Sequence, residues 1–231
     1  MKKAPESLRF AVMAVDIITF AFIEGVLYGL VSPVNRPPHY INTTGFLGGI
    51  VDAKETAEEA STRVLKQKAT LDKIYLEQLY TFSAVERDKR NRVVSVAYLA
   101  LVRPEVARTY QHADARFVPV KQLTKLAYDH DEMLLSALGR LRGKLTYTTI
   151  AQYLLPKQFT LSELQNVYEV ILQKEIDKRN FRKKILALDI VRETGKMQEG
   201  VKNRPAALYE FTSQKIKELQ YCRLAWTVQP D

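Results

Sequence analysis

The spacing of apolar residues changes along the chain, from mainly strand-like in the first half to mainly helical in the second. Residues 8–31 are almost continuously apolar around a Glu24-Gly25 pair, which predicts two buried strands joined as a hairpin. Strands are also predicted over 74–82 and 92–102, and the second is apolar on both alternating faces, as at the centre of a sheet. A shorter strand is expected over 116–120.

A spacing of three to four residues between apolar positions predicts helices elsewhere in the first part. Residues 55–68 combine an apolar face with glutamates in the first turn, where the helix dipole favours anions. Another helix is predicted over 130–141, and a shorter one over 148–155, before Pro156. Residues 32–44 contain three prolines and are expected to form a loop.

The last third of the chain has the pattern of a winged helix-turn-helix. Thr160 and Glu163 form a capping box, which satisfies free N–H groups at the start of a first helix. Asp177 is expected to cap a second helix over 178–188 after a short turn. A hairpin is predicted to follow over 190–211. Two helices, a short turn and a basic hairpin are the parts of a winged helix.

Length and charge indicate two domains and a polyanionic partner. The 231 residues are 46% apolar and 26% charged, which is ordinary for a globular protein of two domains. We place an α/β domain with a linking helix over 1–145 and the winged helix-turn-helix over 146–231. The net charge of +9 favours nucleic acid as a partner.

Membrane insertion and secretion are not expected. The apolar segment 8–31 contains Arg9, Asp16 and Glu24, each costly inside a bilayer, and no cleavage site for a signal peptide closes it. The single cysteine, Cys222, excludes an internal disulfide and suits a reducing cytoplasm.

Basic residues concentrate on the second helix of the winged segment and on its hairpin. Residues 178–204 contain nine Lys or Arg residues and three acidic ones. One interpretation is that these residues contact the major groove of DNA and the flanking phosphates. The alternative interpretation is that they form a basic helix exposed to solvent. The candidate DNA-binding residues are Lys178, Arg179, Asn180, Arg182, Lys183, Lys202 and Arg204.

Residues 48–71 resemble a Nudix box, the motif that holds divalent metals on diphosphate hydrolases. Gly49, Glu55 and Arg63 match its frame. The resemblance implies three glutamates after the arginine, but the chain has Val64, Gln67 and Lys68 at those positions. Mg²⁺ needs carboxylate or carbonyl oxygens, so we expect no metal, no cofactor and no catalytic residue here.

An alternative function, of a different class, is that of an active Nudix pyrophosphatase. Glu58 and Glu59 lie on the same predicted helix and could substitute for the missing carboxylates. Mg²⁺-dependent turnover of ADP-ribose would support that alternative.

A longer resemblance covers roughly residues 12–211 and identifies the chain as similar to the NrtR family of Nudix-related transcriptional regulators. The segment DKRNFRKK, following FTLSELQ and preceding RPAALYEF, is more specific than the box. Further matching segments are YLEQLYTF (75–82), RVVSVAYLALV (92–102) and LAYDHDE (126–132). The resemblance implies a Nudix-like α/β sandwich followed by an α+β winged helix-turn-helix.

The resemblance also implies a function. It is repression of NAD-metabolism genes by a homodimer on a palindromic operator, release by ADP-ribose or a related nucleotide, and little or no hydrolase activity. The chain departs from the family pattern at Lys89 and Gly48, where proline is usual, and over 32–44. Relatives of the same architecture respond to pentose sugars, so a regulator of sugar utilisation remains the alternative.

Four residues are candidates for contact with the small ligand: Arg63, Glu77, Arg87 and Arg90. Arginine pairs bidentately with diphosphate oxygens, but these arginines could equally tie the helix and a surface turn in place. The acidic run 129–132 resembles a metal cluster, although consecutive helical residues point in different directions and a helix start is the better interpretation.

Overall fold

The computed structural model describes residues 10–200 and 205–219 of the chain. Backbone contacts divide it into two compact units. Of the described residues, unit 1 contains 10–19, Leu30–Ala100 and Gln111–Ser136, and unit 2 contains Phe20–Gly29, Leu101–Tyr110, 137–200 and 205–219. The domain limits 1–145 and 146–231 therefore stay a prediction.

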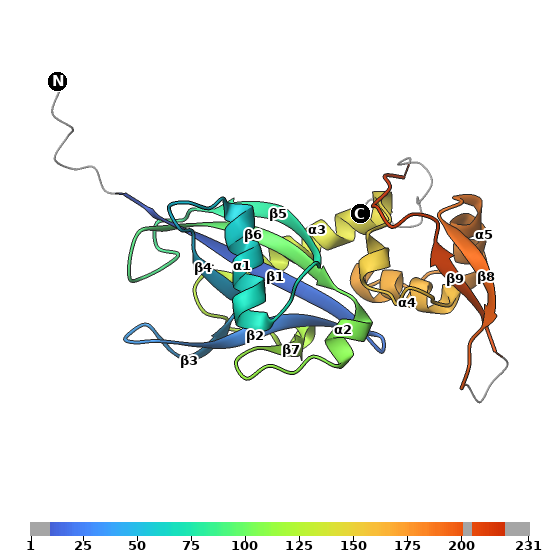
Figure 1. Ribbon diagram of the computed structural model, residues 1–231, viewed down its shortest axis with the longest axis horizontal. Coiled ribbons are helices and arrows are strands. Elements are labelled where there is room, and N and C mark those ends of the chain that lie inside the picture. Colours follow the sequence, from blue (N-terminus) through green and yellow to red (C-terminus); the bar gives the residue numbers. More distant parts are fainter. Residues whose placement is uncertain (1–9, 201–204, 220–231) are drawn as a thin grey trace, which may run out of the picture. The chain divides into compact units, whose positions relative to one another are not determined.

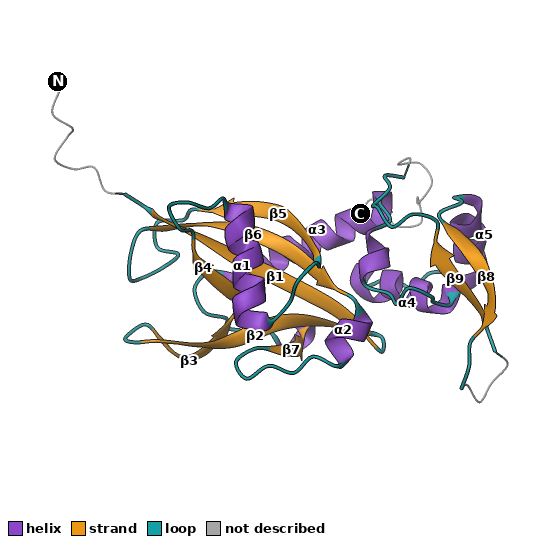
Figure 2. Cartoon of the chain, in the orientation of Figure 1, coloured by secondary structure: helices purple, strands orange, loops and turns teal. Residues whose placement is uncertain are grey.

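A seven-stranded sheet forms the first part of the chain (Figure 2). Its central order is β3-β2-β1-β6-β5, with β4 paired to β1 and β7 paired to β2. The strands are β1 (Val12–Ile23), β2 (Val26–Arg36), β3 (Tyr40–Gly45), β4 (Leu47–Ile50), β5 (Tyr75–Phe82), β6 (Val93–Val102) and β7 (Arg116–Pro119). The predicted central strand is confirmed, because β6 lies inside the sheet and is buried along nearly its whole length.

The predicted hairpin of β1 and β2 is also confirmed. Ile23 pairs with Val26, and the turn residues Glu24 and Gly25 have φ of 50° and 81°. Positive φ costs glycine nothing, which explains the glycine in this turn. The loop predicted over 32–44 is wrong, because β2 continues to Arg36 and β3 begins at Tyr40. The neighbouring prolines Pro37 and Pro38 occupy the turn between the two strands, where they interrupt no ladder.

Helix α1 (Ala57–Ala69) lies on one face of the sheet (Figure 1). Thr56 caps it: Thr56 Oγ1 accepts from the N–H of Glu59 at 3.2 Å, and Glu59 Oε2 accepts from the N–H of Thr56 at 2.7 Å. The helix packs against β4 through Val64, which is 1% exposed. A Cβ at Gly49 would lie 2.8 Å from Val64 Cγ2, so glycine permits this close approach.

The remaining helices differ from expectation mainly in length. α3 (His130–Tyr147) starts where predicted and continues beyond residue 141. A 3₁₀ turn, η2 (Ile150–Tyr153), replaces the predicted helix over 148–155. The five-residue α2 (Pro104–Arg108) and the 3₁₀ turn η1 (Val120–Gln122) were not predicted, because elements this short carry no repeating pattern.

The winged helix-turn-helix is confirmed within unit 2 (Figure 2). Thr160 and Glu163 form the predicted capping box of α4 (Leu161–Leu172). Asp177 Oδ1 accepts from the N–H of Asn180 at 2.8 Å at the start of α5 (Lys178–Ala187). Strands β8 (Val191–Met197) and β9 (Ala207–Phe211) pair as the wing.

The core between α4 and α5 is apolar and aromatic. Tyr168 and Phe181 are 1% and 0% exposed, and their ring centroids lie 5.6 Å apart at 67°.

Across the part of the chain that the structure describes, no helix has the length and apolar character to cross a bilayer.

Candidate functional site

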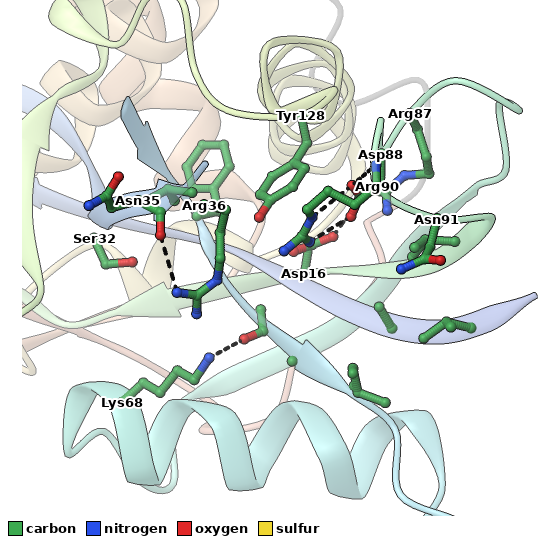
Figure 3. A pocket seen from close by; sticks show the side chains of 18 of the residues that line it. Asp16, Ser32, Asn35, Arg36, Lys68, Arg87, Asp88, Arg90, Asn91 and Tyr128 are labelled. Atoms are coloured by element: carbon green, nitrogen blue, oxygen red, sulfur yellow. Dashed lines mark hydrogen bonds and ion pairs between the residues drawn. The ribbon is translucent and has the colours of Figure 1, made fainter. Parts of the chain in front are cut away.

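A cavity of about 540 Å³ opens in unit 1, between the sheet, α1 and the loop after β5 (Figure 3). Strands β1, β2 and β4 contribute to its wall, and Lys68 enters from α1. The polar side chains that line it are Asp16, Ser32, Asn35, Arg36, Lys68, Arg87, Asp88, Arg90, Asn91 and Tyr128. Cationic groups therefore outnumber carboxylates in its wall.

Arg87 belongs to a buried ion network at the base of this cavity. Its Nε and Nη2 donate to the two carboxylate oxygens of Asp129 at 2.9 and 2.7 Å, and Nη2 also lies 3.2 Å from Asp16 Oδ2. Ser95 Oγ donates to the same Asp16 oxygen at 2.6 Å. Burial raises the pKa of Asp16, but His130, Ser95 and Arg87 outweigh it and hold that pKa below its usual value.

His130 completes the network from the first residue of α3. Its Nδ1 accepts from the backbone N–H of Phe46 at 2.9 Å, which places the ring proton on Nε2. That Nε2 lies 3.4 Å from Asp16 Oδ1. Asp131 Oδ2 accepts from the N–H of Leu126 at 3.1 Å. The interpretation of 129–132 as a helix start is confirmed, and its side chains tie α3 to the sheet.

Arg90 is paired with the carboxylate two residues before it. Its Nε and Nη2 donate to the oxygens of Asp88 at 3.0 and 2.7 Å. Its guanidinium also lies 5.4 Å from the ring centroid of Tyr128 and 6.0 Å from that of Tyr40, within cation–π range. Burial raises the pKa of Asp88, and the hydrogen bonds from Arg90 overcome this and lower it.

Arg63 joins the start of α1 to the end of β4. Its Nε donates to Glu55 Oε2 at 2.9 Å, and its Nη2 donates to the carbonyl of Ile50 at 3.0 Å. The hydrogen bonds from Arg63, together with one from the backbone N–H of Asp52, lower the pKa of Glu55 to about 2. Two residues of the box frame, Glu55 and Arg63, thus hold a helix and a strand together.

Among the described residues that line the cavity, two of the four predicted ligand residues are absent. These are Arg63 and Glu77, whose Oε2 accepts from Tyr75 Oη at 2.5 Å. The other two, Arg87 and Arg90, line the cavity but are each already paired with a carboxylate. Ligand contact by any of the four stays a prediction.

The sequence predictions missed two cations of the cavity, Arg36 and Lys68. Lys68 Nζ donates to the carbonyl of Gly48 at 2.6 Å, and Arg36 Nη1 donates to the carbonyl of Asn35 at 3.2 Å. Figure 3 shows the two side chains approaching from opposite walls. Lys68 stands at a box position where a glutamate is expected. This replacement of an acid by a base was the sequence feature that could have marked Lys68 as a candidate for anion binding.

Neither Arg36 nor Lys68 has a carboxylate within salt-bridge distance among the described residues. Burial lowers the pKa of Lys68 from its ordinary value of 10.5, and the charges of Arg36 and Arg63 lower it further against the opposing effect of Asp16. No group of three His, Cys, Asp or Glu side chains suited to a metal ion occurs within residues 10–200 and 205–219.

The outer face of α5 forms a second candidate site, in unit 2. Phe181 and Ile185 are 0% exposed and fix the inner face of this helix. The predicted DNA-binding side chains of the helix are all exposed: Lys178, Arg179, Asn180, Arg182 and Lys183. Lys202 and Arg204 lie outside the described residues. DNA contact by these seven residues stays a prediction.

Comparisons with known proteins agree on the family of the second unit. A family model described as the NrtR DNA-binding winged helix domain matches residues 151–211. A curated protein of Acinetobacter baylyi, named ADPR responsive transcriptional repressor NtrR, is 34% identical over 208 residues, which cover 87% of this chain and 82% of that protein.

Two solved structures from Shewanella oneidensis extend the similarity to the fold. NrtR complexed with a 27mer DNA is 30% identical, with a TM-score of 0.75, covering 87% of this chain and 93% of that one. The NUDIX domain of NrtR complexed with ADP ribose is 28% identical, with a TM-score of 0.50, covering 61% of this chain and 94% of that one. The expected Nudix-like sandwich followed by a winged helix is thereby confirmed.

Proposed function

The chain belongs to the NrtR family of transcriptional regulators, and from this membership we propose that it is a DNA-binding repressor released by ADP-ribose or a related nucleotide. The observation that carries the proposal is the presence, in one chain, of a cation-lined cavity and an exposed basic helix in a winged helix-turn-helix. The genes that it controls are proposed to be those of NAD metabolism, as the family resemblance implies.

DNA binding is assigned to α5 and the wing. A helix of this kind enters the major groove with the residues of its N-terminal half, while flanking cations contact phosphates. The exposed Arg179 and Arg182 are the side chains best suited to guanine or to a phosphate, and Asn180 is suited to adenine. A homodimer would place two such helices on the halves of a palindromic operator, about one DNA turn apart.

The effector is assigned to the cavity of unit 1. Its volume of about 540 Å³ suits a small molecule. Arg36 and Lys68, which have no carboxylate partner among the described residues, suit a phosphorylated ligand better than a neutral pentose, which has no charge to offer them. A nucleotide effector is therefore favoured over the sugar effector of other regulators.

The absence of hydrolase activity is part of the proposal. Val64 is buried against Gly49 and has no oxygen to offer a metal. Of the two possible substitutes, Glu59 already accepts the N–H of Thr56 in the capping box. Without carboxylates around a metal, no bound water is activated for attack on a diphosphate.

Repression and release are proposed to follow from a population shift. The ligand is proposed to bind better to a dimer geometry that cannot contact both half-sites. Ligand binding then lowers the affinity for DNA by the same factor by which DNA binding lowers the affinity for the ligand. Helix α3 is the proposed coupling element, because it begins at His130 in the buried network and its second half belongs to unit 2.

The proposal is tested by fluorescence anisotropy with the full chain and a labelled duplex covering the region upstream of its own coding sequence and neighbouring genes. We expect binding that ADP-ribose reverses and ribose 5-phosphate does not. A parallel incubation of the protein with ADP-ribose and Mg²⁺ should yield no AMP. Binding that ADP-ribose leaves unchanged would contradict the proposed effector, and turnover at enzymatic rates would contradict the loss of catalysis.

A further inference from the structure

Two cations of the cavity wall, Arg36 and Lys68, have no carboxylate within salt-bridge distance among the described residues. Lys68 occupies the box position of a metal-binding glutamate and reaches Gly48 from α1, and Arg36 projects from the end of β2 (Figure 3). Both line the same cavity. Burial lowers the pKa of Lys68, and the charge of Arg36 lowers it further.

The other cations of the cavity have their charge matched locally. Arg87 is held between Asp16 and Asp129, and Arg90 is paired with Asp88. The side chain of Arg87 is only 3% exposed, so it offers almost no surface to a ligand. The positive charge left for an anion is therefore concentrated at the end of the cavity formed by Arg36 and Lys68.

The position of Lys68 is defined by the backbone beside it. Its Nζ donates to the carbonyl of Gly48 at 2.6 Å, which uses one of the three hydrogens of the ammonium group. A Cβ at Gly48 would lie 2.1 Å from Asp16 Oδ1, so β4 and β1 can approach this closely only with glycine at this position. Two hydrogens of Lys68 remain for oxygens of a ligand.

We propose that Lys68 is a tethered cation in place of the divalent metal, and that with Arg36 it binds the diphosphate of the effector without Mg²⁺. This inference rests on the proposed function, since it assigns the phosphate end of that effector. A lysine ammonium neutralises phosphate charge as a point charge, and a guanidinium adds paired hydrogen bonds. Neither group generates hydroxide from water at neutral pH, as a bound metal does.

The test is isothermal titration calorimetry of the full chain with ADP-ribose, in EDTA and again in excess Mg²⁺. We expect the same affinity in both buffers for the unaltered chain. Lys68→Ala should weaken binding about 10-fold or more, in line with the loss of a charge-assisted contact. Lys68→Glu should abolish binding in EDTA, because it places a carboxylate opposite the phosphates.

The matched control is Lys66→Ala, an exposed lysine on the same helix that is absent from the cavity lining. It should leave the affinity unchanged. Adenosine, which has no phosphate, serves as a second ligand: any affinity for it should be the same in the unaltered chain and in Lys68→Ala. A thermal melt of each variant confirms that it is folded.

The outcomes separate the two proposals. Binding of ADP-ribose that requires Mg²⁺, or unchanged binding by Lys68→Ala, would overturn the role of Lys68 while leaving ADP-ribose as the effector. No binding of ADP-ribose by the unaltered chain in either buffer would overturn the proposed effector, and this inference with it.

Discussion

Nη2 of Arg87 lies 3.2 Å from Oδ2 of Asp16, although 71 positions separate the two residues in the chain. The contact joins β1 to the loop after β5, and through Asp129 it also reaches the start of α3. Both side chains are largely buried, with 3% and 12% of their surface exposed. The pair is therefore a structural tie under the cavity.

Replacing Arg87 should destabilise the fold. Arg87→Met would leave the buried carboxylates of Asp16 and Asp129 without the guanidinium that pairs with both, which costs about 3–5 kcal/mol in comparable cases. Urea denaturation of the variant and the unaltered chain measures the difference. The neighbouring Lys89→Ala is the control, because Lys89 is exposed, and it should change stability little. Equal stability of Arg87→Met would refute the structural role.

The close approach of β4 and α1 predicts a coupled pair of substitutions. Gly49→Ala places a methyl group 2.8 Å from Val64 Cγ2, and such overpacking costs about 1–3 kcal/mol. Val64→Ala removes the obstructing methyl groups, so the double variant should lose less stability than the sum of the two single variants. Denaturation midpoints of the four proteins form the required cycle. Simple additivity would mean that the two positions do not interact.

The Glu55–Arg63 pair predicts a pH-dependent part of the stability. The pKa of Glu55 is about 2 in the folded chain, below its ordinary value of 4.5. Folding therefore favours the ionised form, and the contribution is complete above pH 4.5 and disappears as the pH falls toward 2. The unaltered chain should be more stable than Glu55→Gln at pH 6, and this advantage should shrink steadily below pH 4.5. A difference that stays constant down to pH 2 would contradict the pairing.

The exposed face of α5 predicts a salt-dependent loss of DNA binding. Replacing both Arg179 and Arg182 with Ala should weaken DNA binding strongly and leave ADP-ribose binding unchanged. Each lost phosphate contact should reduce the slope of log K against log[salt] by about 0.9. Anisotropy titrations at several salt concentrations measure both quantities, with the exposed Lys121→Ala of unit 1 as control. Joint loss of DNA and ADP-ribose binding would show that unfolding is the cause.

Local signals predicted much of the fold. The Glu24-Gly25 turn, the capping box at Thr160 and the cap at Asp177 each depend on neighbours within a few residues, and the structure confirms all three. The end of β2 and the whole of β3 were missed. The prolines near them mark a turn, but they do not indicate how few residues separate the two strands.

The candidate site was predicted less completely, since charges were visible in the chain but their partners were not. Arg87 and Arg90 resembled ligand contacts, and the fold supplies each of them with a carboxylate. Arg36 was assigned to a loop, and Lys68 was considered only as a missing glutamate. Both are left without a carboxylate among the described residues.

The amino-acid sequence by itself determined most of the longer elements, the family, and the presence of Val64, Gln67 and Lys68 at box positions where glutamates are expected, because these depend on residue identity and short-range spacing. Only the tertiary structure decided which cations are available to a ligand. The strength of an ion pair depends on the distance between its members and on their burial, and folding brings together residues far apart in the chain. That is why Arg87 lies between Asp16 and Asp129, while Arg36 and Lys68 line the cavity with no carboxylate of the described residues within salt-bridge distance.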